Sequence, residues 1–278
     1  TYSRFIGLDL ETWLAEDLID QLIPGGLNES VFCDSHSEMI EFGHRYDVPV
    51  YPCLGWGFWT RWAYLDLSQG KHRTAGSYLE TLYGGQPDRL GKPSYILQYN
   101  GWEGTLSAWR GAAMNLLNDG ADGLYIFNPA LGEPAWWREI GETATMERKD
   151  KLFGVDRFPP ETGNGDQVEL NQGEKVGLSF LVGEDTTSAG ISQLRLRAHM
   201  WDLTNDDEIV LQLNGEQLEG IEVNNAFTSP EEGQWLECDL TSDQVVRGKN
   251  AVELSLKNRI ESQQAPLVLN TVQLKVRY

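Results

Sequence analysis

The chain has 278 residues and a formal net charge of −20, from 42 acidic against 22 basic side chains. This excess of negative charge argues against nucleic acid and anionic membranes as partners, because both would repel the chain. No apolar run reaches membrane-spanning length, and three widely spaced cysteines indicate neither a disulfide framework nor a metal site. The length suits one large globular domain or two ordinary ones.

In the first half, the pattern predicts strands that alternate with helices. The expected strands are Phe5–Leu10, Leu18–Ile23, Val48–Leu54 and Leu124–Phe127, and the main helices are Ser37–Tyr46 and Thr105–Asn118. The last helix and strand give the clearest signal. Apolar residues of Thr105–Asn118 fall on one helix face, Gly120 is expected to end that helix, and Leu124–Phe127 is predicted to be buried on both faces. This order is typical of a parallel α/β fold.

Four strands are half of what a (β/α)₈ barrel needs. We therefore predict a partial TIM barrel of about four βα units over residues 1–155, with two further helices at Ala135–Ile140 and Thr143–Lys151. An open four-stranded α/β sheet is the alternative. The abrupt start at Thr1 favours a fragment whose first half lies upstream. Residues 156–166, rich in Pro, Gly and polar side chains, are predicted to be an interdomain linker.

Residues 167–278 follow a different period. Apolar and polar side chains alternate, which predicts strands at Val176–Val182, Gln193–Met200, Glu208–Leu213, Trp235–Leu240, Ala251–Leu256 and Leu267–Val276. The pair Asn214 and Gly215 predicts a type I′ hairpin turn. Six strands without intervening helices indicate an antiparallel β-sandwich of jelly-roll or similar winding.

Several segments resemble bacterial family-10-like glycosyl hydrolases of the planctomycete type. The resemblance is carried by their order along nearly the whole chain: Gly7–Trp13, Glu16–Asp20, Pro24, Val48–Tyr51, Ala121–Asn128, Arg138–Gly141, Lys149–Lys151, Leu213–Glu216 and Val276–Tyr278. The family implies a TIM-barrel catalytic domain with a C-terminal β-sandwich that acts on polysaccharide outside the cytoplasm, either secreted or periplasmic. The chain would hold the second half of that barrel.

One departure from the family bears on catalysis. In many barrel glycosidases the two catalytic carboxylates follow the fourth and seventh strands. In this mapping the fourth strand is absent, and the seventh, Val48–Leu54, ends in Gly55 and Trp56 without a Glu.

Glycoside hydrolysis needs two carboxylates astride the scissile bond. The candidates are Asp9 and Glu11 at the end of the first predicted strand, Asp34 in the next loop, and Glu103 beside Trp102. An apolar neighbour raises the pKa of a carboxyl group, which suits Glu103 as the acid. Each candidate also has a structural interpretation. Asp9 could cap the helix at Trp13, Asp34 could serve a cap or turn, and Glu103 could favour the helix dipole.

A cluster of aromatic and amide side chains forms the predicted sugar-binding set, because sugars stack on indole rings and amides bond to hydroxyls. Its members are Trp56, Trp59, Trp62, Tyr99, Asn100, Trp102 and Asn128. The alternative is a small satellite core under a long loop, with Asn128 as a turn residue. Trp201 and Trp235 in the sandwich could be further sugar platforms or core residues.

The sequence thus predicts a glycoside hydrolase with a carbohydrate substrate and no cofactor or metal. A non-catalytic carbohydrate-binding protein, or a degenerate barrel with a structural sandwich, is the alternative. No pattern in the chain indicates an oligomeric state.

Overall fold

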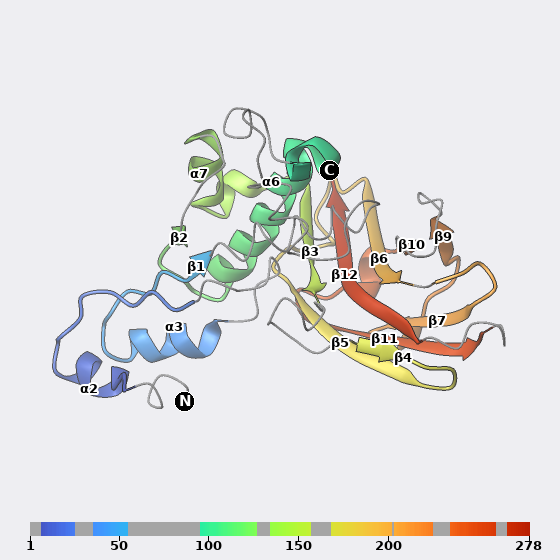
Figure 1. Ribbon diagram of the computed structural model, residues 1–278. Coiled ribbons are helices and arrows are strands. Elements are labelled where there is room, and N and C mark those ends of the chain that lie inside the picture. Colours follow the sequence, from blue (N-terminus) through green and yellow to red (C-terminus); the bar gives the residue numbers. More distant parts are fainter. Residues whose placement is uncertain are drawn as a thin grey trace, which may run out of the picture.

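The protein combines a small parallel α/β part with a large antiparallel β-sandwich (Figure 1). The computed structural model describes residues 7–25, 36–54, 95–126, 134–156, 168–201, 203–224, 234–259 and 266–278. Strands hold more of these residues than helices do, so the fold is mixed and mainly β.

In the α/β part, two short strands, β1 (Cys53–Leu54) and β2 (Tyr125–Ile126), pair in parallel. The segment that leads into β1 also forms a parallel β-bridge on its other side, between Val50 and Leu22. The helices are α2 (Leu10–Ala15), α3 (Ser37–His44), α6 (Tyr95–Asn118) and α7 (Pro134–Ile140). Three chain segments therefore run side by side in one direction, with helices between them, as the alternating pattern predicts.

Several predicted boundaries were wrong in this part. Leu10 begins α2 instead of ending a strand, and α6 starts ten residues before the predicted Thr105. Tyr125 of β2 is 41% exposed, so this strand is not buried on both faces. The predicted helix Thr143–Lys151 is one 3₁₀ turn, Ala144–Met146, followed by a strand. The apolar Leu152 and Phe153, just beyond the predicted helix, are buried and pair with β12, so the chain enters a sheet there.

The predicted end of α6 is confirmed. Gly120 has φ +100° and its amide donates to the carbonyl of Leu117 at 3.2 Å. This left-handed conformation, which glycine adopts without strain, turns the chain from the helix towards β2.

All six strands predicted in residues 167–278 are present, within a ten-stranded sandwich. Its strands are β3 (Lys151–Asp156), β4 (Val168–Leu170), β5 (Lys175–Val182), β6 (Gln193–Trp201), β7 (Glu208–Leu213), β8 (Glu216–Gln217), β9 (Glu222–Asn224), β10 (Gln234–Asp239), β11 (Gly248–Asn258) and β12 (Leu267–Arg277). One sheet has the order β3-β12-β6-β10-β9, with β4 also paired to β12. The other has the order β5-β11-β7-β8. From β5 to β7 and from β10 to β12, successive strands alternate between the sheets, as they do in jelly rolls.

The hairpin between β7 and β8 follows the sequence prediction. Asn214 and Gly215 both have positive φ, at 53° and 87°, and Leu213 pairs with Glu216 across the turn. The Asn214 side chain also bonds to Asn250 at 2.9 Å, which ties the turn to β11. The local turn chemistry is therefore enough to set this register.

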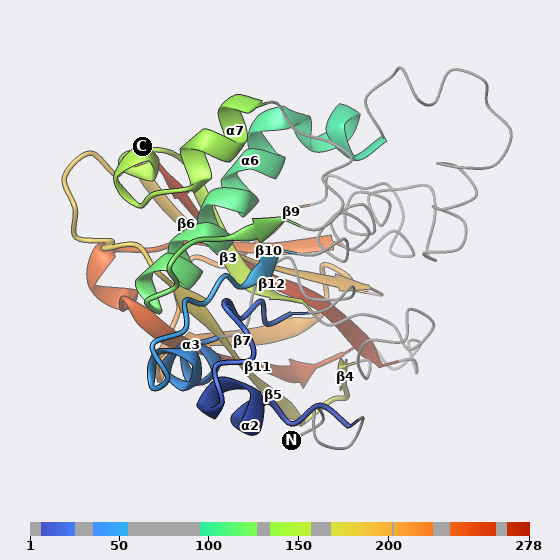
Figure 2. The same ribbon diagram turned by 90° about the vertical axis from the view of Figure 1, so that its left-hand side faces the viewer.

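Helix α6 connects the two parts. It lies between the β1–β2 pair and β3 (Figures 1 and 2), and its Trp109 and Leu116 belong to the same buried cluster as residues of both sandwich sheets. The contact with β3 is close, because a Cβ atom on Gly111 would lie 2.0 Å from the carbonyl oxygen of Leu152. Strand β3 precedes the predicted linker but pairs along six residues with β12.

A smaller core supports the other side of the parallel segments. Leu14, Leu22, Ile40, Val48 and Val50 are buried together there. Among the described helices, none is both long and apolar enough to cross a membrane.

Candidate functional site

The two parallel strands end at one edge of their sheet. β1 and β2 pair in register, Cys53 with Tyr125 and Leu54 with Ile126. Because the strands run in the same direction, the chain leaves both of them at the same edge of the sheet. The next residues along the chain are 55–94 and 127–133, which hold Trp56, Trp59, Trp62 and Asn128. These four, and Asp34, lie outside the described residues.

The start of α6 lies towards that same edge. The helix ends at Asn118, a few residues before the amino end of β2, and runs back against the strand (Figure 2). Its 24 residues make it about 36 Å long at 1.5 Å per residue, so its first turns extend well past the strand's carboxyl end. The backbone positions of the remaining candidates are on these turns: Tyr99, Asn100, Trp102 and Glu103. Their side chains are outside the description.

Asp9 and Glu11 lie on α2. Asp9 occupies the N-cap position, accepts a hydrogen bond from the Thr12 hydroxyl at 2.9 Å, and its carbonyl accepts from the Trp13 amide at 3.1 Å. Glu11 is in the first helical turn, and both carboxylates are exposed. Asp9 thus stands at the N-cap position, but its side chain makes no capping hydrogen bond to a backbone amide.

A carboxylate that the sequence did not single out fixes the parallel segments. Asp122 accepts a hydrogen bond from the Val50 amide at 2.7 Å, and its Oδ2 lies 2.8 Å from His44 Nε2. The His44 contact, followed by the Val50 amide, lowers the pKa of Asp122. Asp122 thus joins α3, the β1 segment and the turn before β2 in one hydrogen-bonded network.

In the sandwich, Trp235 is a core residue. It is 4% exposed, its ring centroid lies 4.9 Å from that of His199, and the Arg197 guanidinium carbon lies 4.1 Å from the centre of the Trp235 ring. A sugar could not stack on a ring enclosed in this way. The Trp201 side chain is outside the description. No group of metal-ligating side chains occurs among the described residues.

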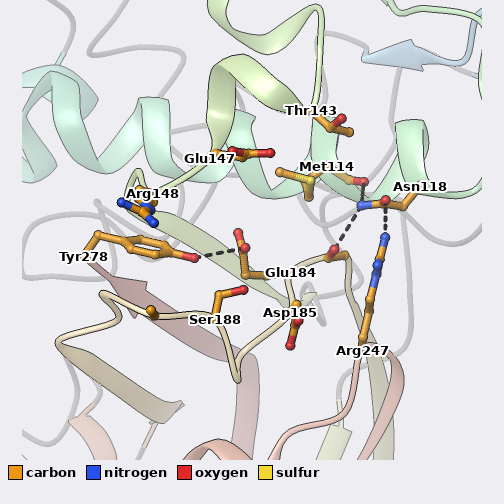
Figure 3. Close-up of a pocket in the computed structure, with 12 residues that line it drawn as sticks. Met114, Asn118, Thr143, Glu147, Arg148, Glu184, Asp185, Ser188, Arg247 and Tyr278 are labelled. Carbon is orange, nitrogen blue, oxygen red and sulfur yellow. Dashed lines mark hydrogen bonds between the residues drawn. The ribbon is translucent and has the colours of Figure 1, made fainter.

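The described residues do form a polar pocket of about 440 Å³ (Figure 3). It opens where the C-terminal half of α6, the 3₁₀ turn, the β5–β6 loop and Tyr278 meet. Its polar lining includes Asn118, Glu147, Arg148, Asp185, Arg247 and Tyr278.

Glu184, which lines this pocket, belongs to a buried charge pair. Lys151 Nζ lies 2.5 Å from Glu184 Oε2, and the Tyr278 hydroxyl donates to Glu184 Oε1 at 3.0 Å. The Lys151 side chain is fully buried, and this burial lowers its pKa although the Glu184 contact opposes the shift. Burial, with the Glu184 charge, raises the pKa of Tyr278. At neutral pH the Tyr278 phenol is therefore protonated and donates to Glu184.

Sequence reasoning missed this pocket because its residues come from five separate segments. In the sequence, Tyr278 is part of the family resemblance, and Lys151 is part of it and also the last residue of a predicted helix. The one available signal was a charged residue directly beside apolar ones, since Lys151 precedes Leu152 and Phe153 at the start of a strand.

No family model matches the chain, and no curated protein matches it in sequence. Solved structures match the chain with low sequence identity and low TM-scores. A β-porphyranase of glycoside hydrolase family 86 from the human gut bacterium Bacteroides plebeius aligns at 12% identity and a TM-score of 0.30, over 46% of this chain and 21% of that one.

Two other matches have different activities. An insecticidal delta-endotoxin from Bacillus thuringiensis aligns at 10% identity and a TM-score of 0.30, over 47% of this chain and 24% of the toxin. A cycloisomaltooligosaccharide glucanotransferase from a Paenibacillus species aligns at 11% identity and a TM-score of 0.26, over 85% and 47%. This chain thus spans less than half the length of each. Similarity at this level assigns neither a family nor an activity.

Proposed function

We propose that the chain is a carbohydrate-active protein, and specifically a glycoside hydrolase whose site lies at the carboxyl edge of its parallel strands. The α/β part would be a partial TIM barrel of about four βα units, and the jelly-roll-like sandwich an accessory domain. The observation that carries the proposal is the in-register parallel pairing of β1 and β2. Both strands end at one edge, towards which the first turns of α6 also extend, and Trp56 and Asn128 follow these strands in the sequence.

In this proposal Glu103 is the general acid. Glu103 is on the first half of α6, which extends towards that edge. The neighbouring Trp102 would favour the protonated form of its carboxyl group. The second carboxylate would come from Asp34, Asp9 or Glu11, at roughly 5–10 Å from the first. The tryptophans would stack against sugar rings, and Tyr99, Asn100 and Asn128 would bond to hydroxyls. A polysaccharide substrate implies action in a secreted or periplasmic location.

The test compares Glu103→Gln with wild type on a panel of poly- and oligosaccharides, by release of reducing ends. Loss of a general acid lowers the rate by about a hundredfold or more. Glu142→Gln is the matched control, because Glu142 is an exposed carboxylate elsewhere on the chain. If Glu103→Gln hydrolyses the substrate as fast as wild type does, the assignment of Glu103 is wrong.

The alternative, a non-catalytic binding protein, makes a different prediction. The wild-type protein would then migrate more slowly in gels that contain a polysaccharide, but it would release no reducing ends from that polysaccharide. In both cases Trp56→Ala and Trp102→Ala should weaken retardation. Retardation that survives both changes would contradict any sugar site at this edge.

A further inference from the structure

The pocket beside Tyr278 has the features of a binding site for a small organic anion. Its volume of about 440 Å³ falls within the range of small-molecule sites. It contains none of the candidate residues of the proposed site, and its lining belongs to the interface between α6 and the sandwich. None of its polar groups serves the proposed hydrolytic chemistry.

Two guanidinium groups on different segments supply donors. Arg247 donates to the side-chain oxygen of Asn118, and Asn118 in turn donates to the carbonyls of Met114 and Gly183 at 2.8 and 2.9 Å (Figure 3). This series of hydrogen bonds orients the Arg247 guanidinium from helix α6. Arg148 lies beside Tyr278 on another side of the pocket, in a left-handed backbone conformation with φ 53°. Within the described residues, neither guanidinium is ion-paired with a carboxylate.

Carboxylates in the same lining limit what the arginines can bind. Glu147, Glu184 and Asp185 share this lining with the two arginines, and Glu184 is already paired with the buried Lys151. A phosphate dianion would be repelled by the three carboxylates. A single carboxylate matches the planar guanidinium fork, while its hydroxyl neighbours could donate to Glu147 and Asp185.

We propose that this pocket binds a hydroxylated carboxylic acid, in the form of a sugar acid such as a uronate unit. The preference for a sugar acid over other hydroxy acids rests on the proposed function, whereas the carboxylate site rests on the pocket alone. Arg148, beside Tyr278, would bind the carboxylate, Arg247 at the other end of the pocket would donate to a hydroxyl, and the acidic side chains would accept from the other hydroxyls.

The test is titration of the full chain with D-glucuronate by isothermal calorimetry, with glucose, glycerate, acetate and inorganic phosphate as comparison ligands. We expect glucuronate to bind most tightly. Glucose lacks the carboxylate, acetate lacks the hydroxyls and phosphate is a dianion. Binding of glycerate as tight as that of glucuronate would retain the carboxylate site but overturn the choice of a sugar acid. Tightest binding of phosphate, or no binding of glucuronate, would overturn the proposal.

Two variants locate the binding. Arg148→Asn removes the guanidinium and keeps a residue that tolerates the left-handed backbone, and Arg247→Gln removes the second one. Loss of one charge-assisted contact should weaken glucuronate binding about tenfold or more. Arg138→Gln, an exposed arginine on α7, is the matched control. Unchanged binding in both pocket variants would overturn the assignment. The Trp56 and Trp102 variants should leave it intact, so this site and the proposed hydrolytic site can fail separately.

Discussion

Lys275 is a lysine placed among positive charges. In the backbone pairing of β12 with β6, Lys275 lies opposite Arg195. Burial, together with the charges of Arg197 and Arg277, lowers the pKa of Lys275 to about 8. Glu237 opposes this shift, and Arg195 adds to it. The charged ammonium group therefore has a lower affinity for its proton in the folded state than in the unfolded chain.

This shift predicts a pH dependence of stability. Below pH 8 Lys275 is charged in both states, so the cost of burial is present in full. Between pH 8 and 10.5 the folded protein loses this proton before the unfolded chain does, so the free energy of unfolding rises with pH. Lys275→Met should be more stable than wild type at pH 7, and the difference should shrink towards pH 9.5, measured by urea unfolding.

Lys151 contributes a dependence of the same sign, but it is present in both proteins and drops out of the comparison. Lys257→Met, at an exposed position of β11, is the control and should show no pH-dependent difference. A constant difference between Lys275→Met and wild type across this range would contradict the assigned shift.

At the level of elements, the contact between α6 and β3 depends on a missing side chain. Gly111 lies in the middle of α6, where alanine is ordinarily the better residue by about 0.5–1 kcal/mol. Here an added Cβ would overlap the Leu152 carbonyl at 2.0 Å, so the helix would have to move away from the sandwich.

Gly111→Ala should therefore destabilise the protein by about 2 kcal/mol or more, as overpacking of a core does. The measurement is the midpoint of thermal or urea unfolding. Gly177→Ala in β5 is the control, because nothing lies within 4 Å of its added Cβ. Equal effects of the two changes would mean that the close approach of α6 to β3 is not formed in solution.

The elements also show what the sequence could predict. The six sandwich strands and the Asn214–Gly215 turn follow from local alternation and turn chemistry, which act within a few residues. The strand at β3 was missed because its partner, β12, is more than a hundred residues away. Asp122 was missed for a similar reason: its carboxylate gains meaning only when His44 and Val50 lie beside it. Among the predicted catalytic carboxylates, only Asp9 and Glu11 have described side chains.

At the scale of the whole molecule, the buried cluster that unites α6 with the sandwich makes the two parts interdependent. Trp109, Leu152 and Phe153 lie before residue 167, yet they pack with the sandwich core. A fragment of residues 167–278 would lose these side chains and expose one edge of β12.

We therefore expect the fragment 167–278 to lack a cooperative unfolding transition and to give poorly dispersed NMR spectra. A fragment of residues 105–278, which keeps most of α6, α7 and β3, should unfold cooperatively. Circular dichroism during heating distinguishes the two. A fragment 167–278 with the melting temperature of the full chain would show that the sandwich folds without α6 and β3.

The central place of β12 also affects how the protein is made. This strand pairs with β3, β4 and β6, and all three precede it in the order of synthesis. On the ribosome, β3 and β6 must wait for β12, with their edges open, until nearly the whole described chain has been translated. Such long-range pairing is slow and leaves nascent strands prone to aggregation. Production of the protein should therefore respond to chaperones that hold nascent chains and to slower translation.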